Sequence, residues 1–393
     1  MASLPGQREP KPEKVDAFQD PYTKGDAEQL KALGYVAIGQ FLWLGDVTTA
    51  QVQQILGDDI AIFIETEHFK LASTLRSFPW PKDKEWRAAL RAEVEALAER
   101  CPGFKTKSRS LDPWLRAHLY AQRLEALYAD FCGKLGIAPG TFPEDRGGKR
   151  TADYMGEGPY LGQPGKYLVV LAHKALSAGT YTRAFQGSAA RDTTRFNHDK
   201  EGSLATVIAA EFAEKALRDD RNLHCHLAYS VTHNLVDGFK YYWQSVPAWL
   251  SEGISLWFSR PIREEFLNFS GTDDAGATTL RGHEWERRVR MRVDNDVWPK
   301  AADLCQVMSA AELDFSSHMM VWSRVDFLMR GHAEKFGRFV ARMKAPMTNE
   351  ARQPTVAEIV QRQAQALRDE LGFDEAGFDA AWLAFVRETY SRK

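Results

Sequence analysis

His233 and Glu252 are the two side chains whose types and spacing suggest metal chemistry in this sequence. Nineteen positions separate them, so an imidazole and a carboxylate from two successive helices can face each other. Both side chains are zinc-ligand types, but a catalytic zinc normally holds three protein ligands and a water. Two ligands predict a weak site. We therefore expect a core histidine that hydrogen-bonds a buried glutamate, with a bound metal as the alternative.

The neighbouring histidines do not complete a metal site with His233. His226 lies seven positions earlier in the sequence, which is about 10.5 Å along a helix. Since the two side chains lean the same way along the axis, they are too far apart to bind one ion together. His224 lies farther still. Asp237, one turn beyond His233, points to the side opposite the usual ligand and stays open as an alternative third ligand.

Four short passages carry a recognisable pattern. They are residues 65–71 (ETEHFKL), 232–235 (THNL), 249–253 (WLSEG), and a C-terminal set at 322–328, 371–374 and 382–386. Together they resemble the peptidase-MA-like, gluzincin-type families of bacterial zinc metallopeptidases, and the Trp-Leu-x-Glu-Gly run after Thr-His is the most specific. The resemblance implies a zincin-like α+β fold. It would have a small N-terminal mixed sheet with helices, followed by a mostly helical C-terminal half.

The same resemblance places His233 and Glu252 at metal-ligand positions. The family carries His-Glu-x-x-His on a helix, where the first His is a ligand and the Glu is the base. Tyr229 and Ser230 stand at those two positions. A neutral phenol is a poor zinc ligand, and a serine hydroxyl does not replace a carboxylate as the base that activates water. The motif is therefore degenerate, and no residue is assigned as catalytic.

His318 is a further candidate near the site. It lies four positions before Trp322, where such families often place a tyrosine that can donate a hydrogen bond to a ligand carbonyl. The other interpretation, which we favour from the sequence, is a helix-surface histidine beside Met319 and Met320.

These residues predict a catalytically inactive, gluzincin-like protein, a pseudoenzyme. It would bind a peptide or protein segment in the former substrate cleft and need no cofactor. Residues 65–71 are the candidate edge strand for that segment, since an extended peptide can add to a sheet edge. One alternative is a metal-dependent hydrolase with a rearranged zinc site. A second is a structural scaffold protein whose cleft is closed.

The elements that would position these residues fall into four parts: a lead-in at 1–45, an α/β part at 46–200, zincin-like helices at 201–262 and a helical part at 263–393. Strands are predicted at 60–65, 68–71, 166–172 and 180–185. Helices are predicted from apolar spacing at 50–56, 82–100, 113–135, 203–217, 223–236, 247–258, 282–293, 318–329, 333–343, 356–371 and 375–392. Strands first and helices after favour α+β layering over a doubly wound sheet.

Composition excludes several classes of function. The chain has 393 residues, 44% hydrophobic and 26% charged, and a net charge of −2, which gives no reason to expect nucleic acid as a partner. No run of eighteen apolar residues predicts a transmembrane helix. The N-terminal residues lack the apolar core of a signal peptide. Family habit implies an extracytoplasmic location, with the export signal absent from this chain. The four cysteines have no metal-type spacing.

Overall fold

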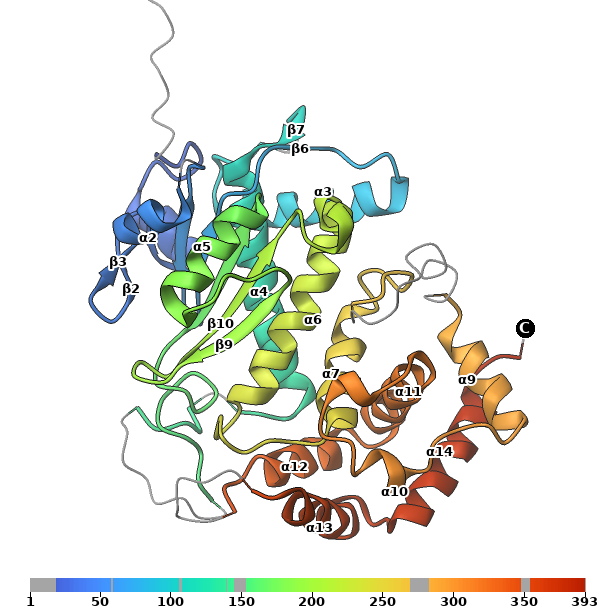
Figure 1. Cartoon of the computed structure of the whole chain (residues 1–393). Coiled ribbons are helices and arrows are strands. Elements are labelled where there is room, and N and C mark those ends of the chain that lie inside the picture. The colour runs from blue at the N-terminus through green and yellow to red at the C-terminus, as the bar shows by residue number, and fades with distance from the viewer. Residues whose placement is uncertain are drawn as a thin grey trace, which may run out of the picture.

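The computed structural model describes residues 19–57, 59–105, 108–138, 140–144, 153–268, 283–347 and 354–392. Its strands lie between residues 35 and 209, and the elements that follow are helices. Figure 1 shows this order, with the sheet in blue to green and the C-terminal helices in orange and red. The expected α+β class, a mixed sheet followed by a mostly helical half, is confirmed.

A six-stranded mixed sheet forms the centre of the N-terminal half. Its strands follow the spatial order β1 (Tyr35–Ile38), β4 (Ile62–Thr66), β5 (Phe69–Ser73), β8 (Tyr167–Ala172), β10 (Ser203–Ala209) and β9 (Thr194–His198). β8 pairs in parallel with both β5 and β10. The remaining pairs are antiparallel. The two edges of the sheet are therefore β1 and β9.

Helices cover both faces of this sheet. α4 (Pro113–Lys134) packs on β4 and β5, α6 (Asp220–Gly238) packs on β10, and α5 (Ala175–Gln186) contacts β8, β9 and β10. In β9, Arg195 reaches Asp237 of α6, whereas the His198 ring lies 5.6 Å from Phe185 of α5. Since side chains an odd number of positions apart point to opposite faces, α5 and α6 lie on opposite faces. The central strands β8 and β10 are accordingly buried along their whole length.

Smaller elements complete the N-terminal half. They are α1 (Ala27–Ala32), β2 (Leu42–Leu44), β3 (Val47–Thr48), α2 (Thr49–Leu56), β6 (Phe78–Pro79), α3 (Lys84–Arg100) and β7 (Ser110–Leu111). α2 begins with a reciprocal cap, in which the Thr48 side chain accepts from the Gln51 amide and the Gln51 side chain accepts from the Thr48 amide. Such a cap satisfies amides that have no partner within the helix.

The second half is helical. Its elements are η1 (Ala213–Arg218), α7 (Ala248–Ser259), α9 (Trp285–Asp294), α10 (Ala301–Leu304), η2 (Ala310–Glu312), α11 (Phe315–Gly331), α12 (Ala333–Met343), α13 (Val356–Ala366), η3 (Leu367–Leu371) and α14 (Glu375–Thr389). α7 packs against both α6 and α11. It therefore joins the sheet-bearing half to the C-terminal helices (Figure 1).

Two predicted elements are wrong. Residues 203–217 were expected as a helix, but 203–209 form the fully buried strand β10. A short apolar run buried on both faces has no alternation that would separate strand from helix. Residues 180–185 were expected as a strand, but they lie in α5, where the Thr182 hydroxyl donates to the Ala178 carbonyl one turn earlier. Tertiary packing has overridden the β propensity of Thr and Tyr there.

The sheet spans residues 35–209, so it begins before and ends after the α/β part expected at 46–200. Residues 1–18 of the expected lead-in lie outside the described residues, and its later part forms α1, β1 and β2 instead of an extended segment. None of the helices formed by the described residues combines the length and the apolar character that crossing a bilayer requires.

Candidate functional site

The site lies where α6 packs against α7. Asp219 caps the start of α6, because its side chain accepts a 3.0 Å hydrogen bond from the Asn222 amide. The helix is buried along most of its length. α7 begins after Pro247. His233 Nε2 lies 3.2 Å from Glu252 Oε1. The prediction that these two side chains meet across adjacent helices is therefore confirmed.

Gly253 brings the third helix to the site. A Cβ added at this glycine would lie 2.7 Å from the Val321 carbonyl oxygen and 2.5 Å from Val325 Cγ2. These distances are shorter than any ordinary contact, so α7 can approach α11 this closely only without a side chain here. The glycine of the Trp-Leu-x-Glu-Gly run thus has a packing role, and it sets Glu252 beside α11.

Tyr229 occupies the position expected for a first metal ligand. Its hydroxyl lies 3.0 Å and 2.8 Å from the two carboxylate oxygens of Glu252 and donates to them. Its ring meets the His233 ring edge-on, with centroids 4.7 Å apart. Burial, followed by the Glu252 carboxylate, raises the pKa of Tyr229 well above its ordinary value. The side chain is therefore a neutral donor and not a phenolate ligand.

Glu252 is the centre of the cluster and is 2% exposed. Burial alone would raise the pKa of its carboxyl. Electrostatic attraction to His233, then to His318, and the hydrogen bond from Tyr229 together hold that pKa below its usual range. The buried carboxylate is thus ionised and surrounded by groups that stabilise its charge.

His318 comes to the same carboxylate from α11. Its Nε2 lies 3.8 Å from Glu252 Oε2, and its Nδ1 lies 2.9 Å from the Asp314 carbonyl oxygen, to which it donates. The residue is 3% exposed, so the expectation of a helix-surface histidine is wrong. The sequence pattern of α11 could not distinguish the two cases, because its residues from His318 to Met329 are buried on every side. Burial lowers the pKa of His318, and Glu252 opposes that effect.

Other residues considered from the sequence lie apart from this cluster. Ser230 is buried in α6, and within the described residues no imidazole or carboxylate hydrogen-bonds it as a base would. Asp237 pairs with Arg195 of β9 at 2.9 Å, which removes it as a third ligand. His226 Nε2 lies 2.7 Å from the Thr193 hydroxyl. The His224 ring lies 6.2 Å from the Trp86 ring.

The candidate edge strand is also corrected. Residues 65–71 span the hairpin from β4 to β5, and each of those strands is paired on both sides. The edge beside α6 is β9, where Arg195 contacts α6. The sequence signal for this strand is weak, because Phe196 is the one strongly apolar side chain from Thr194 to His198.

The residues present do not fit a catalytic zinc of the family type. Such a site needs three protein ligands, and here the expected first ligand is a phenol that donates to Glu252. Within the described ranges, no group of three or more His, Cys, Asp or Glu side chains has an arrangement suited to a metal ion. The four cysteines are free thiols.

Comparisons with protein-family models, with curated proteins and with solved structures found no match to this chain.

Proposed function

We propose that this protein is a catalytically inactive, zincin-like protein that binds an extended peptide or protein segment. The hydrogen bonds from Tyr229 to both oxygens of Glu252 carry the first part. The phenol hydroxyl lies within hydrogen-bond distance of both oxygens, where a metal would have to compete with it, and Ser230 supplies no carboxylate to activate a water. The site then stabilises the packing of α6, α7 and α11 and performs no hydrolysis.

The edge strand β9 supports the binding role. An edge strand offers backbone groups to which an extended segment can hydrogen-bond. Thr193 and Arg195 hold this edge against α6 through His226 and Asp237. A segment added to β9 would therefore run beside the helix that bears Tyr229 and His233.

Hydrogen–deuterium exchange on the protein tests this proposal. A peptide selected from a library of extended hexapeptides should slow exchange at the β9 amides of residues 194–198. The opposite edge, β1 at residues 35–38, is the internal control and should not change. Protection of β1 instead of β9, or a library that yields no binder, would contradict the proposal.

A metal-dependent hydrolase with a rearranged site is the alternative that a specific observation favours. His233 and His318 face different oxygens of the same carboxylate. The Nδ1–H of His318 donates to a backbone carbonyl, as the outer nitrogen of a metal-bound histidine usually does. Stoichiometric zinc in the purified protein that is lost on His318→Ala would favour this alternative.

A scaffold protein with a closed cleft is the second alternative. Glu252, His233 and His318 are 2%, 4% and 3% exposed, so solvent hardly reaches the cluster. The exchange experiment also separates this alternative, because a scaffold protein predicts no protection at β9.

A further inference from the structure

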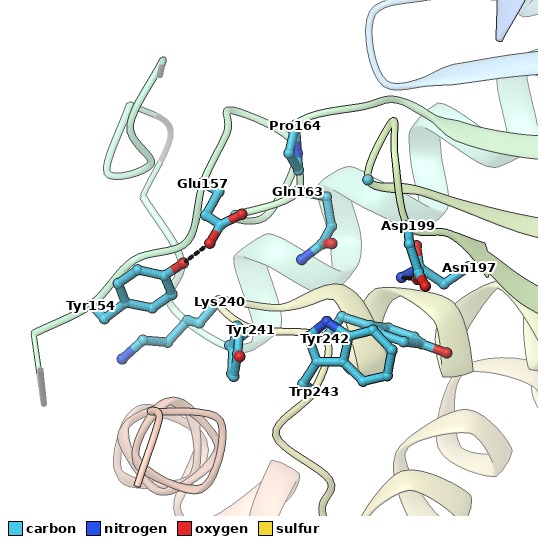
Figure 2. Close-up of a pocket in the computed structure, with 12 residues that line it drawn as sticks. Tyr154, Glu157, Gln163, Pro164, Asn197, Asp199, Lys240, Tyr241, Tyr242 and Trp243 are labelled. Atoms are coloured by element: carbon cyan, nitrogen blue, oxygen red, sulfur yellow. Dashed lines mark hydrogen bonds between the residues drawn. The ribbon is translucent and has the colours of Figure 1, made fainter. Parts of the chain in front are cut away.

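A small, open pocket lies at the C-terminal end of β9, away from the Glu252 cluster. Three segments far apart in the sequence form it: the loop that ends at Pro164, the β9–β10 hairpin, and the residues that follow α6. Figure 2 shows Asn197 and Asp199 on one side, Tyr242 and Trp243 below them, and Glu157 opposite. None of the residues considered above for zinc binding or hydrolysis lines this pocket.

Two aromatic rings form one wall. Tyr242 and Trp243 meet edge-on with centroids 5.1 Å apart. Trp243 is 40% exposed, which is unusual for so large an apolar side chain in this molecule. A tryptophan face attracts a cation within about 6 Å, and the attraction increases as the cation loses water.

Carboxylates supply the complementary charge. Asp199 accepts a 2.7 Å hydrogen bond from Asn197 Nδ2, and no Lys or Arg of the described ranges pairs with it. On the loop opposite, Glu157 accepts a 3.0 Å hydrogen bond from the Tyr154 hydroxyl. Burial, followed by the negative charges of Asp237 and Asp199, raises the pKa of Tyr242, and Arg195 opposes that effect.

The basic residue in the lining directs its charge away from Asp199. Lys240 is 5% exposed, and its ammonium group donates to the Ala341 carbonyl oxygen of α12 at 3.3 Å. Figure 2 shows its side chain extending away from Asp199. The stem of Lys240 therefore lines the pocket while its charge lies at the boundary with α12.

The register of β9 connects the pocket to the sheet edge. Arg195 and Asn197 are two positions apart, so both point to the α6 face, where Arg195 meets Asp237 and Asn197 meets the pocket. Alternate side chains of a segment paired with the free edge of β9 would point to that same face. One of them would enter between Asp199 and Trp243.

We infer that this pocket binds a basic side chain, lysine or arginine, of the extended segment that adds to β9. The inference rests on the proposed function for the segment itself. Its observations are the aromatic wall, the Asp199 carboxylate and the placement of both at the end of the edge strand. An aromatic face beside a carboxylate suits an ammonium or guanidinium group better than a neutral one.

Small cations test the chemistry of the pocket without a peptide. The full chain is titrated with n-butylammonium and n-butylguanidinium, and with n-butylurea as the neutral match, while backbone and indole resonances are followed by NMR. Both cations should shift the signals of Asn197, Asp199 and Trp243, and the urea should bind about tenfold more weakly. Asp199→Asn should weaken cation binding about fivefold. Asp192→Asn, an exposed aspartate at the other end of β9, should not.

Equal binding of n-butylurea, or unchanged cation binding in Asp199→Asn, would overturn the inference. So would binding of a neutral sugar, such as glucose, in place of the cations. A positional-scanning hexapeptide library then separates the two proposals. If the library selects peptides with a basic residue at one position, and Asp199→Asn abolishes that preference, both proposals are supported. Selection without that preference overturns the inference alone. Cation binding with no peptide selection overturns the peptide-binding function and leaves the cation pocket.

Discussion

Two buried carboxylates hold α6 in place, and they differ in the partners that neutralise them. Asp220, at the start of α6, accepts from Arg116 at 3.1 Å, Arg123 at 3.2 Å and Tyr120 at 2.9 Å, all on α4. Glu252 faces the C-terminal half of the same helix. It is surrounded by a phenol and two imidazoles instead of guanidinium groups.

The difference separates an ion network of permanent charges from a cluster whose neutralising groups are imidazoles and a phenol. Burial would raise the pKa of Asp220, yet Arg123 and Arg116 lower it to about 2. Guanidinium groups keep their charge at every accessible pH. Imidazoles are metal ligands and proton carriers. Glu252 is therefore surrounded by groups that can titrate or bind a metal, whereas Asp220 is held by permanent charges.

The largest effect should come from the Asp220 network. Asp220→Asn removes the negative charge that neutralises two buried guanidinium groups. Breaking a buried ion pair costs about 3–5 kcal/mol. Urea unfolding should show a loss of that size. Asp219→Asn is the matched control, because this neighbouring aspartate is an exposed N-cap and asparagine caps equally well. Similar losses in both variants would show that the network has no special role.

Acid should weaken the face of α6 that bears the candidate site. Burial lowers the pKa of His226 from 6.5 to about 4. The unfolded chain then binds a proton that the folded chain does not, so stability is full above pH 6.5 and falls as the pH drops toward 4. At 1.36 kcal/mol per pKa unit, the loss is about 3 kcal/mol.

Unfolding of the wild-type and His226→Gln proteins between pH 7 and pH 4.5 measures this loss. His224 and His318 have pKa values lowered by burial as well. The His226→Gln variant should therefore still lose some stability in acid, but less than the wild-type protein. An identical pH profile in both proteins would place the acid sensitivity elsewhere.

A smaller effect is expected from Tyr229→Phe. A hydrogen bond to a charged group contributes about 1.5–3 kcal/mol, and His233 and His318 remain beside Glu252. The double-mutant cycle with Glu252→Gln isolates the contact, since residues in direct contact couple whereas distant ones add. Additive losses would mean that the phenol does not stabilise the carboxylate, and the contrast with Asp220 would lose its basis.

The sequence predicted some of these features better than others. The helices of α6 and α7 follow from apolar spacing, and the meeting of His233 with Glu252 follows from the family pattern. The bond from Tyr229 to Glu252 could not be predicted, because it depends on how α6 packs against α7. His318 was misplaced for a related reason, since α11 is buried all round and presents no polar face.

The strands show the same division between local and tertiary information. β8 was predicted because an apolar run after a Gly-rich loop is a strong local signal. The prediction missed β10, although it is equally apolar, because a buried strand and a buried helix share that composition. β9 as the edge beside α6 depends on strand order, which pairing partners far apart in sequence decide.

The central claim is that Tyr229 and Ser230 replace a first ligand and a base on an otherwise zincin-like scaffold. Elemental analysis for zinc in the parent and in the double variant Tyr229→His with Ser230→Glu tests it directly. An imidazole at position 229 lies one turn from His233 on the same helix face, and Glu252 would complete three ligands. Tyr229→Phe with Ser230→Glu is the matched control without the new ligand.

The account predicts substoichiometric zinc in the parent and in the control, and close to one zinc per chain in the folded double variant. A parent that already holds stoichiometric zinc, or a folded double variant that holds no more than its control, would contradict it.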